Sequence, residues 1–135
     1  MINFFSAFVN DNVAKAVMQA QKRVRDQPTE GGTEELPNDT LDWDLYLKWF
    51  KTLGCPTAKL EDVVEHILHA AKVAGVDHVG IGSDFDGVPA LPDELQTASG
   101  LPLVTARLLE RGLSETDVEK ILGGNFLRVF RDIEV

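Results

Sequence analysis

Cysteine is almost absent from this sequence, which contains one, Cys55, among 135 residues. A single cysteine cannot form a disulfide within the chain, so packing and hydrogen bonds must hold the fold together. This scarcity is typical of proteins from a reducing compartment, and we therefore expect a cytoplasmic protein. Cys55 lies between Gly54 and Pro56 with no obvious base beside it, which predicts a small turn residue and not a nucleophile.

Long hydrophobic runs and an excess of positive charge are also missing. No apolar run approaches the roughly 20 residues that a membrane-spanning helix needs. The 13 basic and 22 acidic residues leave a formal net charge of −9, which repels nucleic acid and anionic lipid. We therefore expect no nucleic-acid partner and no membrane segment in this chain. With 44% hydrophobic and 26% charged residues, the composition is that of a soluble globular protein.

Two short apolar runs have the composition of buried strands. Residues 2–8 mix β-branched and aromatic side chains, and residues 79–83 lead into a pair of carboxylates. The long helical region between them predicts that the two strands are parallel and joined by a right-handed crossover. Because two strands leave both edges of a sheet open, the sequence predicts one part of a larger α/β architecture.

Helical periodicity fills most of the remaining sequence. We expect helices at about 13–27, 42–53, 57–74, 103–111, 114–122 and 126–133. Asp11 or Asn12 is expected to cap the first of them, and Ser114 begins a capping box with Asp117. Asn125, which follows two glycines, is expected to cap the last.

Residues 28–56 are interpreted as an inserted loop followed by a short helix. The stretch 28–39 is acidic, contains glycine and proline and has almost nothing to bury. The helix after it holds both tryptophans and the one tyrosine of the chain, so a neighbouring element must cover it. These aromatic positions are Trp43, Tyr46, Trp49 and Phe50.

The run HVGIGSDFDG, residues 78–87, contains the side chains best suited to chemistry. In parallel α/β folds, polar residues at the carboxyl end of a strand line the active site. Asp84 holds that position, and its residue type leaves two interpretations open. It is either a general base or orienting anion, or an acid that accepts backbone N–H groups in a turn. Asp86 is interpreted as a residue that supports the turn.

Other kinds of site fit these residues less well. A strand ending in D-x-D-G also occurs in haloacid dehalogenase-like phosphatases, but Val88 stands where they carry threonine and no later acidic pair follows. That phosphatase function is kept as the weaker alternative. His66 and His69 share one helix face and could bind a metal together, although their apolar neighbours favour histidines that pack between helices.

The stretches EDVVEHILHAAKVAGVDHVGIGSDFDGV and TARLLERGLSETDVEKILGGNFLRVF, and more weakly the opening MINFFSAF, resemble the membrane dipeptidase (renal dipeptidase-like) family of metallopeptidases. The resemblance covers most of the chain outside the segment between Gln27 and Cys55. It implies that residues 1–135 are the C-terminal portion of a (β/α)8 TIM-type barrel of the amidohydrolase kind. It also implies a binuclear zinc centre that hydrolyses dipeptides, with its ligands on earlier strands, so no residue here is carried over as a metal ligand.

The same resemblance implies roles for individual residues. Asp84 matches the acid on the family's last strand, which handles the proton of the attacking water and contacts the substrate amine. Phe5 stands where relatives often carry tyrosine, so a substrate contact there would lack the hydroxyl. Asn125 is expected to tie the last helix under the barrel.

The resemblance also predicts what this chain needs from other polypeptides. By itself the chain is expected to be inactive and to bind no zinc tightly. Its expected partner is the missing N-terminal portion of the barrel or a second copy of itself. The alternative is a non-catalytic or split-half subunit that assembles with a partner chain.

Overall fold

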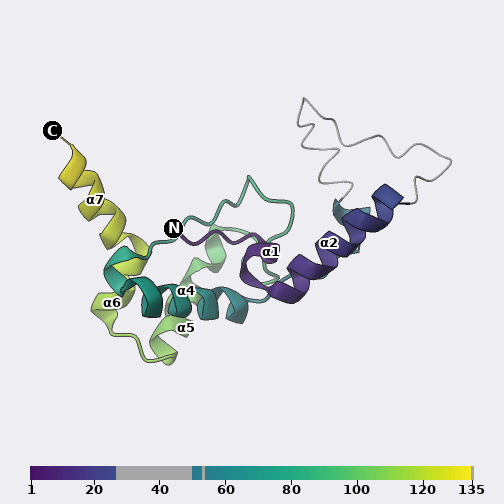
Figure 1. The fold of residues 1–135 in the computed structure, drawn as a ribbon. Coiled ribbons are helices and arrows are strands. Elements are labelled where there is room, and N and C mark those ends of the chain that lie inside the picture. The colour runs from purple at the N-terminus through teal and green to yellow at the C-terminus, as the bar shows by residue number, and fades with distance from the viewer. Residues whose placement is uncertain (27–49, 53, 135) are drawn as a thin grey trace.

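The computed structural model describes residues 1–26, 50–52 and 54–134, and Figure 1 shows their arrangement. Most of the predicted loop and aromatic helix in 28–56 lies outside the described residues. The helices with described bounds are α1 (Ser6–Val9), α2 (Asp11–Asp26), α4 (Leu60–Ala74), α5 (Leu101–Glu110), α6 (Glu115–Glu119) and α7 (Asn125–Ile133), and residues 50–52 are also helical. Two short 3-10 turns, η1 (Val76–His78) and η2 (Ala98–Gly100), and a π-type turn, η3 (Lys120–Gly124), connect them.

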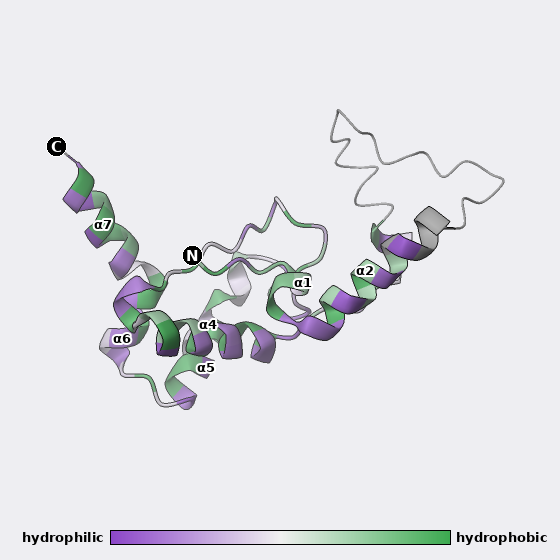
Figure 2. Cartoon of the chain, viewed as in Figure 1, coloured by the Kyte–Doolittle hydropathy of each residue, from purple (hydrophilic) through white to green (hydrophobic). Residues whose placement is uncertain are grey.

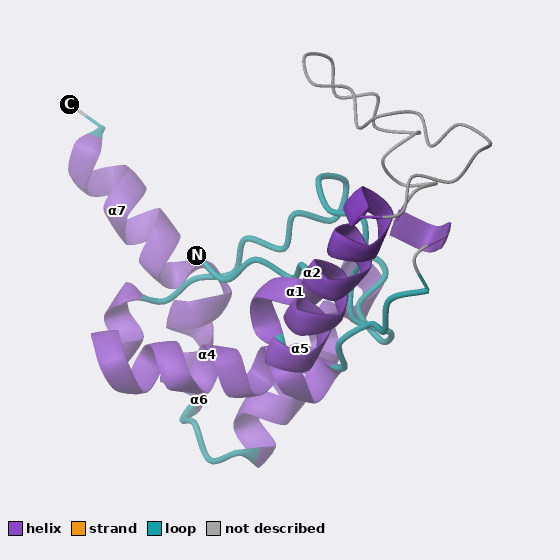
Figure 3. Ribbon diagram, turned by 45° about the vertical axis from the view of Figure 1, so that its right-hand side comes forward, coloured by secondary structure: helices purple, strands orange, loops and turns teal. Residues whose placement is uncertain are grey.

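Two extended segments take the place of the predicted strands and pair at a single parallel bridge. The bridge joins Ile2 to Ile81. The N–H of Ile2 donates to the carbonyl of Gly80 at 2.6 Å, and the N–H of Gly82 donates to the carbonyl of Ile2 at 2.9 Å. The predicted parallel direction is confirmed, but no longer strand forms among the described residues (Figure 3). In the described part of the chain no third segment pairs with either edge, and a pair without neighbours has little to stabilise a longer strand.

The strand predicted over residues 2–8 is wrong beyond Phe5. The side-chain oxygen of Asn3 accepts the backbone N–H of Phe5 at 2.7 Å, which turns the chain out of the extended conformation. The N–H of Phe8 then donates to the carbonyl of Phe5 at 2.8 Å, and residues Ser6–Val9 form α1.

The first long helix has a different cap from the one predicted. Asn10, and neither Asp11 nor Asn12, caps α2. Its side-chain oxygen accepts the N–H groups of Asn12 and Val13 at 2.9 and 3.2 Å. An Asn side chain placed just before the first helical residue reaches these otherwise unpaired donors, whereas a residue already inside the helix cannot.

Helix α4 begins later than the predicted residue 57 because carboxylates satisfy its first backbone donors. The N–H of Lys59 donates to Asp62 at 2.8 Å, and the N–H of Leu60 donates to Glu94 at 2.9 Å. A negative charge at a helix N-terminus also interacts favourably with the helix dipole. Glu94 is distant in sequence, so this start site could not be read from local pattern.

The signals predicted for the later helices are largely confirmed. Gly112, with φ of 93°, follows the end of α5, where an L-residue would be strained. The hydroxyl of Ser114 accepts the N–H of Asp117 at 3.1 Å and so caps α6. Gly123 has a non-helical backbone conformation inside η3 and so interrupts the helical region just before α7 begins at Asn125.

Asn125 does not cap the last helix, because it already has helical backbone angles. Its buried side chain instead donates to the carbonyls of Val76 and Val79 at 2.7 and 2.8 Å. These carbonyls lie in and just after η1. Asn125 therefore ties α7 to the segment that leads into the second extended run.

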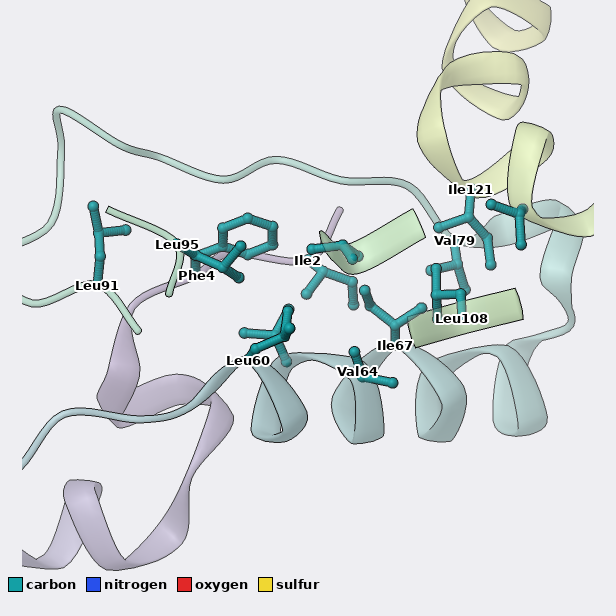
Figure 4. Close-up of a cluster of buried hydrophobic side chains, with 13 residues drawn as sticks. Ile2, Phe4, Leu60, Val64, Ile67, Val79, Leu91, Leu95, Leu108 and Ile121 are labelled. Atoms are coloured by element: carbon teal, nitrogen blue, oxygen red, sulfur yellow. The ribbon is translucent and has the colours of Figure 1, made fainter. Parts of the chain in front are cut away.

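The main core lies between the extended pair and helices α4 and α5 (Figure 4). Ile2 and Phe4 point towards the apolar face of α4, where Val64 and Ile67 are fully or almost fully buried. On the other face of the pair, the side chain of Met1 lies across Gly82. Successive side chains of the extended pair thus point to opposite faces. The candidate site lies on the face that is turned away from α4. None of the described helices is long and apolar enough to cross a membrane.

Candidate functional site

Asp84 lies at the end of the second extended segment and lines an open hollow of about 620 Å³. Its carboxylate is exposed. Asn3 and Ser83 are the other polar side chains in the lining. The remaining lining residues are Met1, Ile81, Gly82, Leu101 and Leu122. The hollow therefore combines one carboxylate with largely apolar walls.

The backbone of Asp84 has an unusual conformation. Its φ is 60°, and it is the one residue besides glycine with a positive φ in the described part of the chain. Aspartate tolerates this left-handed region better than most residues, and such conformations concentrate at functional sites. The N–H of Gly87 donates to the carbonyl of Asp84 at 3.1 Å and closes the turn.

Gly87 leaves the space in which the Asp84 side chain lies. A Cβ atom at position 87 would come within 2.0 Å of Oδ1 of Asp84. Any larger residue there would have to displace the carboxylate. Gly87 therefore has two roles: its N–H closes the turn, and its lack of a side chain leaves room for the carboxylate of Asp84.

Asn3 joins Asp84 to the first extended segment, although the two residues are 81 positions apart. Its Nδ2 donates to Oδ2 of Asp84 at 2.9 Å, while its Oδ1 accepts the N–H of Phe5. Reasoning from the sequence did not identify Asn3. Its place in the sequence could have pointed to it, because Asn3 lies on the strand that was predicted to run parallel to the one ending at Asp84.

The other predicted site residues lie outside this hollow. The ring of Phe5 packs against Phe8 and Phe50, with ring centroids 4.9 and 6.0 Å away. Asp86 is exposed in the turn at residues 85–87. Neither residue lines the hollow around Asp84. The structure thus brings Asp84 together with Asn3 and does not bring Phe5 or Asp86 to the same place.

The prediction that His66 and His69 pack between helices is wrong, since both are exposed on α4. The buried face of this helix is formed by residues such as Val63 and Ile67, and the histidines lie on the opposite side. Within the described residues, no group of three or more His, Cys, Asp or Glu side chains is arranged to hold a metal ion. The described residues therefore do not by themselves fit a complete metal centre.

The family described as membrane dipeptidase, peptidase family M19, matches residues 1–135. This chain belongs to the membrane dipeptidase family. The resemblance inferred from the sequence is thereby confirmed, and membership in a peptidase family leaves the phosphatase alternative without support.

Individual dipeptidases match long stretches of the chain. Dipeptidase tcpJ of Claviceps purpurea (strain 20.1) is 43% identical over 89 residues, which are 66% of this chain and 21% of tcpJ. The uncharacterized dipeptidase C965.12 of Schizosaccharomyces pombe is 33% identical over 128 residues, or 90% of this chain and 29% of that protein.

A solved structure matches the fold. The crystal structure of the probable dipeptidase PvdM from Pseudomonas aeruginosa superposes with a TM-score of 0.61 at 28% identity, covering 93% of this chain and 34% of PvdM. The chain thus spans about a fifth to a third of the length of these relatives.

Proposed function

We propose that this member of the dipeptidase family forms the C-terminal part of an enzyme that hydrolyses dipeptides, and that Asp84 is its catalytic carboxylate. In the assembled enzyme the two extended segments would be the last strands of a (β/α)8 barrel. The observation that carries the proposal is the placement of Asp84. An exposed carboxylate stands at the carboxyl end of a parallel segment, in a hollow, on a backbone of positive φ.

The chemistry of dipeptide hydrolysis suits such a group. The attacking water must lose a proton and the leaving amine must gain one, and a single carboxylate within reach can perform both transfers. A dipeptide also carries a free ammonium group, which a carboxylate attracts and hydrogen-bonds. The apolar walls formed by Ile81, Leu101 and Leu122 offer a surface for an uncharged substrate side chain.

The remaining components of the enzyme are proposed to come from outside these 135 residues. When bound, the binuclear zinc centre expected of this family would supply an activated water and polarise the scissile carbonyl. We expect its ligands on the earlier barrel strands. The chain by itself is then inactive.

The replacement Asp84→Asn in the assembled enzyme tests the proposal. Asparagine has the same shape and accepts a positive φ, so the fold should be retained while the proton acceptor is lost. We expect kcat to fall by about 100-fold to 10,000-fold, the range for loss of a general acid–base group. Steady-state kinetics with a dipeptide would measure this fall, and elemental analysis should find the zinc content unchanged.

Two further variants make the test specific to this carboxylate. Asp132→Asn changes an exposed acid on α7 that does not line the hollow, and it should leave kcat within about threefold of the unmodified enzyme, as expected for a surface site. Asp86→Asn asks whether the other acid of the D-x-D-G run performs the chemistry. Full activity of Asp84→Asn, or loss of turnover in Asp86→Asn alone, would show that Asp84 is not the catalytic group.

A further inference from the structure

We infer that Asn3 is a positioning residue for Asp84, which holds the carboxylate at the hollow from the neighbouring segment. This inference rests on the function proposed for Asp84. Its basis is the pair of hydrogen bonds that one amide side chain makes, 2.9 Å to Oδ2 of Asp84 and 2.7 Å from the N–H of Phe5.

The backbone determines which way the Asn3 amide faces. Only the oxygen of an amide can accept a backbone N–H, and only its nitrogen can donate to a carboxylate. Reversing the amide would put its oxygen against Asp84 and its NH2 group against the N–H of Phe5, which is unfavourable at both ends. The donor therefore always faces Asp84.

A neutral donor suits a carboxylate that must remain reactive. A lysine or arginine in this place would compensate the negative charge of Asp84 and compete with a substrate ammonium. Asn3 binds Oδ2 without cancelling the charge, and Asp84 stays exposed. Gly87 leaves room for the other carboxylate oxygen, since a Cβ there would come within 2.0 Å of Oδ1. The carboxylate is thus bonded to Asn3 through Oδ2, while its Oδ1 lies in space that a larger residue at position 87 would fill.

Asn10 offers a matched control within the same chain. Its Nδ2 donates to Oδ1 of Asp62 at 2.7 Å, and its Oδ1 accepts the backbone N–H groups of Asn12 and Val13. Asn10 therefore repeats the bonding pattern of Asn3, but it does not line the hollow. Equivalent substitutions at the two positions separate general loss of hydrogen bonding from an effect on Asp84.

The substitution Asn3→Asp removes the hydrogen bond to Asp84 and keeps the one from the N–H of Phe5. The new carboxylate still accepts the N–H of Phe5, but it faces Asp84 with a like charge in place of a donor. Nuclear magnetic resonance of the 135-residue chain would report the result through the side-chain couplings of Asp84. We expect Asp84 to change from one rotamer to an average of several in Asn3→Asp, and to be unaffected in Asn10→Asp. An unchanged Asp84 rotamer in Asn3→Asp would overturn the inference.

Gly87→Ala moves the same carboxylate without altering Asn3, and it serves if Asn3→Asp does not fold. The φ of Gly87 is not in the left-handed region, so alanine fits the backbone and the added methyl acts on the side chain of Asp84. We expect the same loss of a single Asp84 rotamer, together with loss of the contact between the Asn3 amide protons and Asp84 in nuclear Overhauser spectra. If the Asn3 contact is lost and the assembled Gly87→Ala enzyme still has the unmodified kcat, the place in which Asn3 holds the carboxylate does not matter for turnover, and the inference fails.

Kinetics of the assembled enzyme distinguish this inference from the proposed function. Asn3→Asp should lower kcat by about 10-fold to 100-fold, as is usual for a partner that orients a reactive group, with little change in KM. Asn10→Asp should not change kcat. If Asp84→Asn is fully active, the proposed function fails. If Asp84→Asn is inactive while Asn3→Asp has the unmodified kcat, only the positioning role fails.

Discussion

The thiol of Cys55 lies against a small apolar cluster formed by Val13, Val17, Phe50 and Ala90. Burial raises the pKa of this thiol above its ordinary value. A raised pKa leaves less thiolate at neutral pH, and the thiolate is the reactive form. The sequence-based interpretation of Cys55 as a residue without nucleophilic function agrees with this environment.

Alkylation of Cys55 by iodoacetamide is therefore expected to be slow in the folded chain. At pH 8 the rate should be at least about threefold lower than in the urea-unfolded chain, because partial burial both raises the pKa and limits access. Mass spectrometry over time would measure both rates in parallel. Equal rates would show that the folded structure does not protect this thiol.

Helix α7 depends on the side chain of its first residue for its attachment to η1. Asn125 donates two hydrogen bonds to backbone carbonyls, and one of them is buried. Arg128 adds an exposed bond from its guanidinium to the carbonyl of Asp77 at 2.9 Å. Since exposed contacts contribute little, the attachment rests mainly on Asn125.

Replacing Asn125 by alanine should lower the free energy of unfolding by about 2 kcal/mol, since two hydrogen bonds are lost and a buried carbonyl is left unpaired. Urea unfolding followed by circular dichroism would measure the change. The matched control is Asp132→Ala, which removes an exposed i,i+4 pair with Arg128 and should change stability by less than about 0.5 kcal/mol. Similar losses in the two variants would exclude a special role for Asn125.

The molecule as a whole exposes an apolar surface on α7. Figure 2 shows hydrophobic colour along one side of this helix, and Figure 1 shows the helix projecting away from α4, α5 and α6. Its large apolar side chains are between 47% and 69% exposed. They are Phe126, Leu127, Val129, Phe130 and Ile133. Exposed apolar surfaces of this size are typical of sites that contact other molecules or that promote aggregation.

We therefore expect the purified 135-residue chain to self-associate in the absence of the rest of a barrel. Sedimentation velocity should show a mean mass that rises with protein concentration. Phe126→Ser with Phe130→Ser should reduce this association, whereas Met18→Ser, which changes an exposed residue on α2, should not. A monomer at every concentration would contradict the expectation. Dipeptidase activity that appears only on adding the upstream part of a relative would support a split-half arrangement.

The sequence by itself determined the features that depend on local chemistry. Gly112 at the end of α5, the Ser114 cap of α6 and the apolar face of α4 follow from backbone freedom, capping and periodicity, which act over a few residues. The stretches at residues 61–88 and 105–130 together identified the family, and the resemblance then selected Asp84 as the catalytic candidate. The parallel direction of the two extended runs followed from the length of the helical connection between them.

Only the tertiary structure decided the features that join distant parts of the chain. The Asn3 contact with Asp84, the Glu94 bond to the start of α4 and the attachment made by Asn125 link residues far apart in sequence. A side chain such as Asn3 or Asn125 can cap, turn or bridge with nearly equal intrinsic preference. Its partner is settled by which donors and acceptors the packed core brings within hydrogen-bonding distance, and no local pattern records that distance.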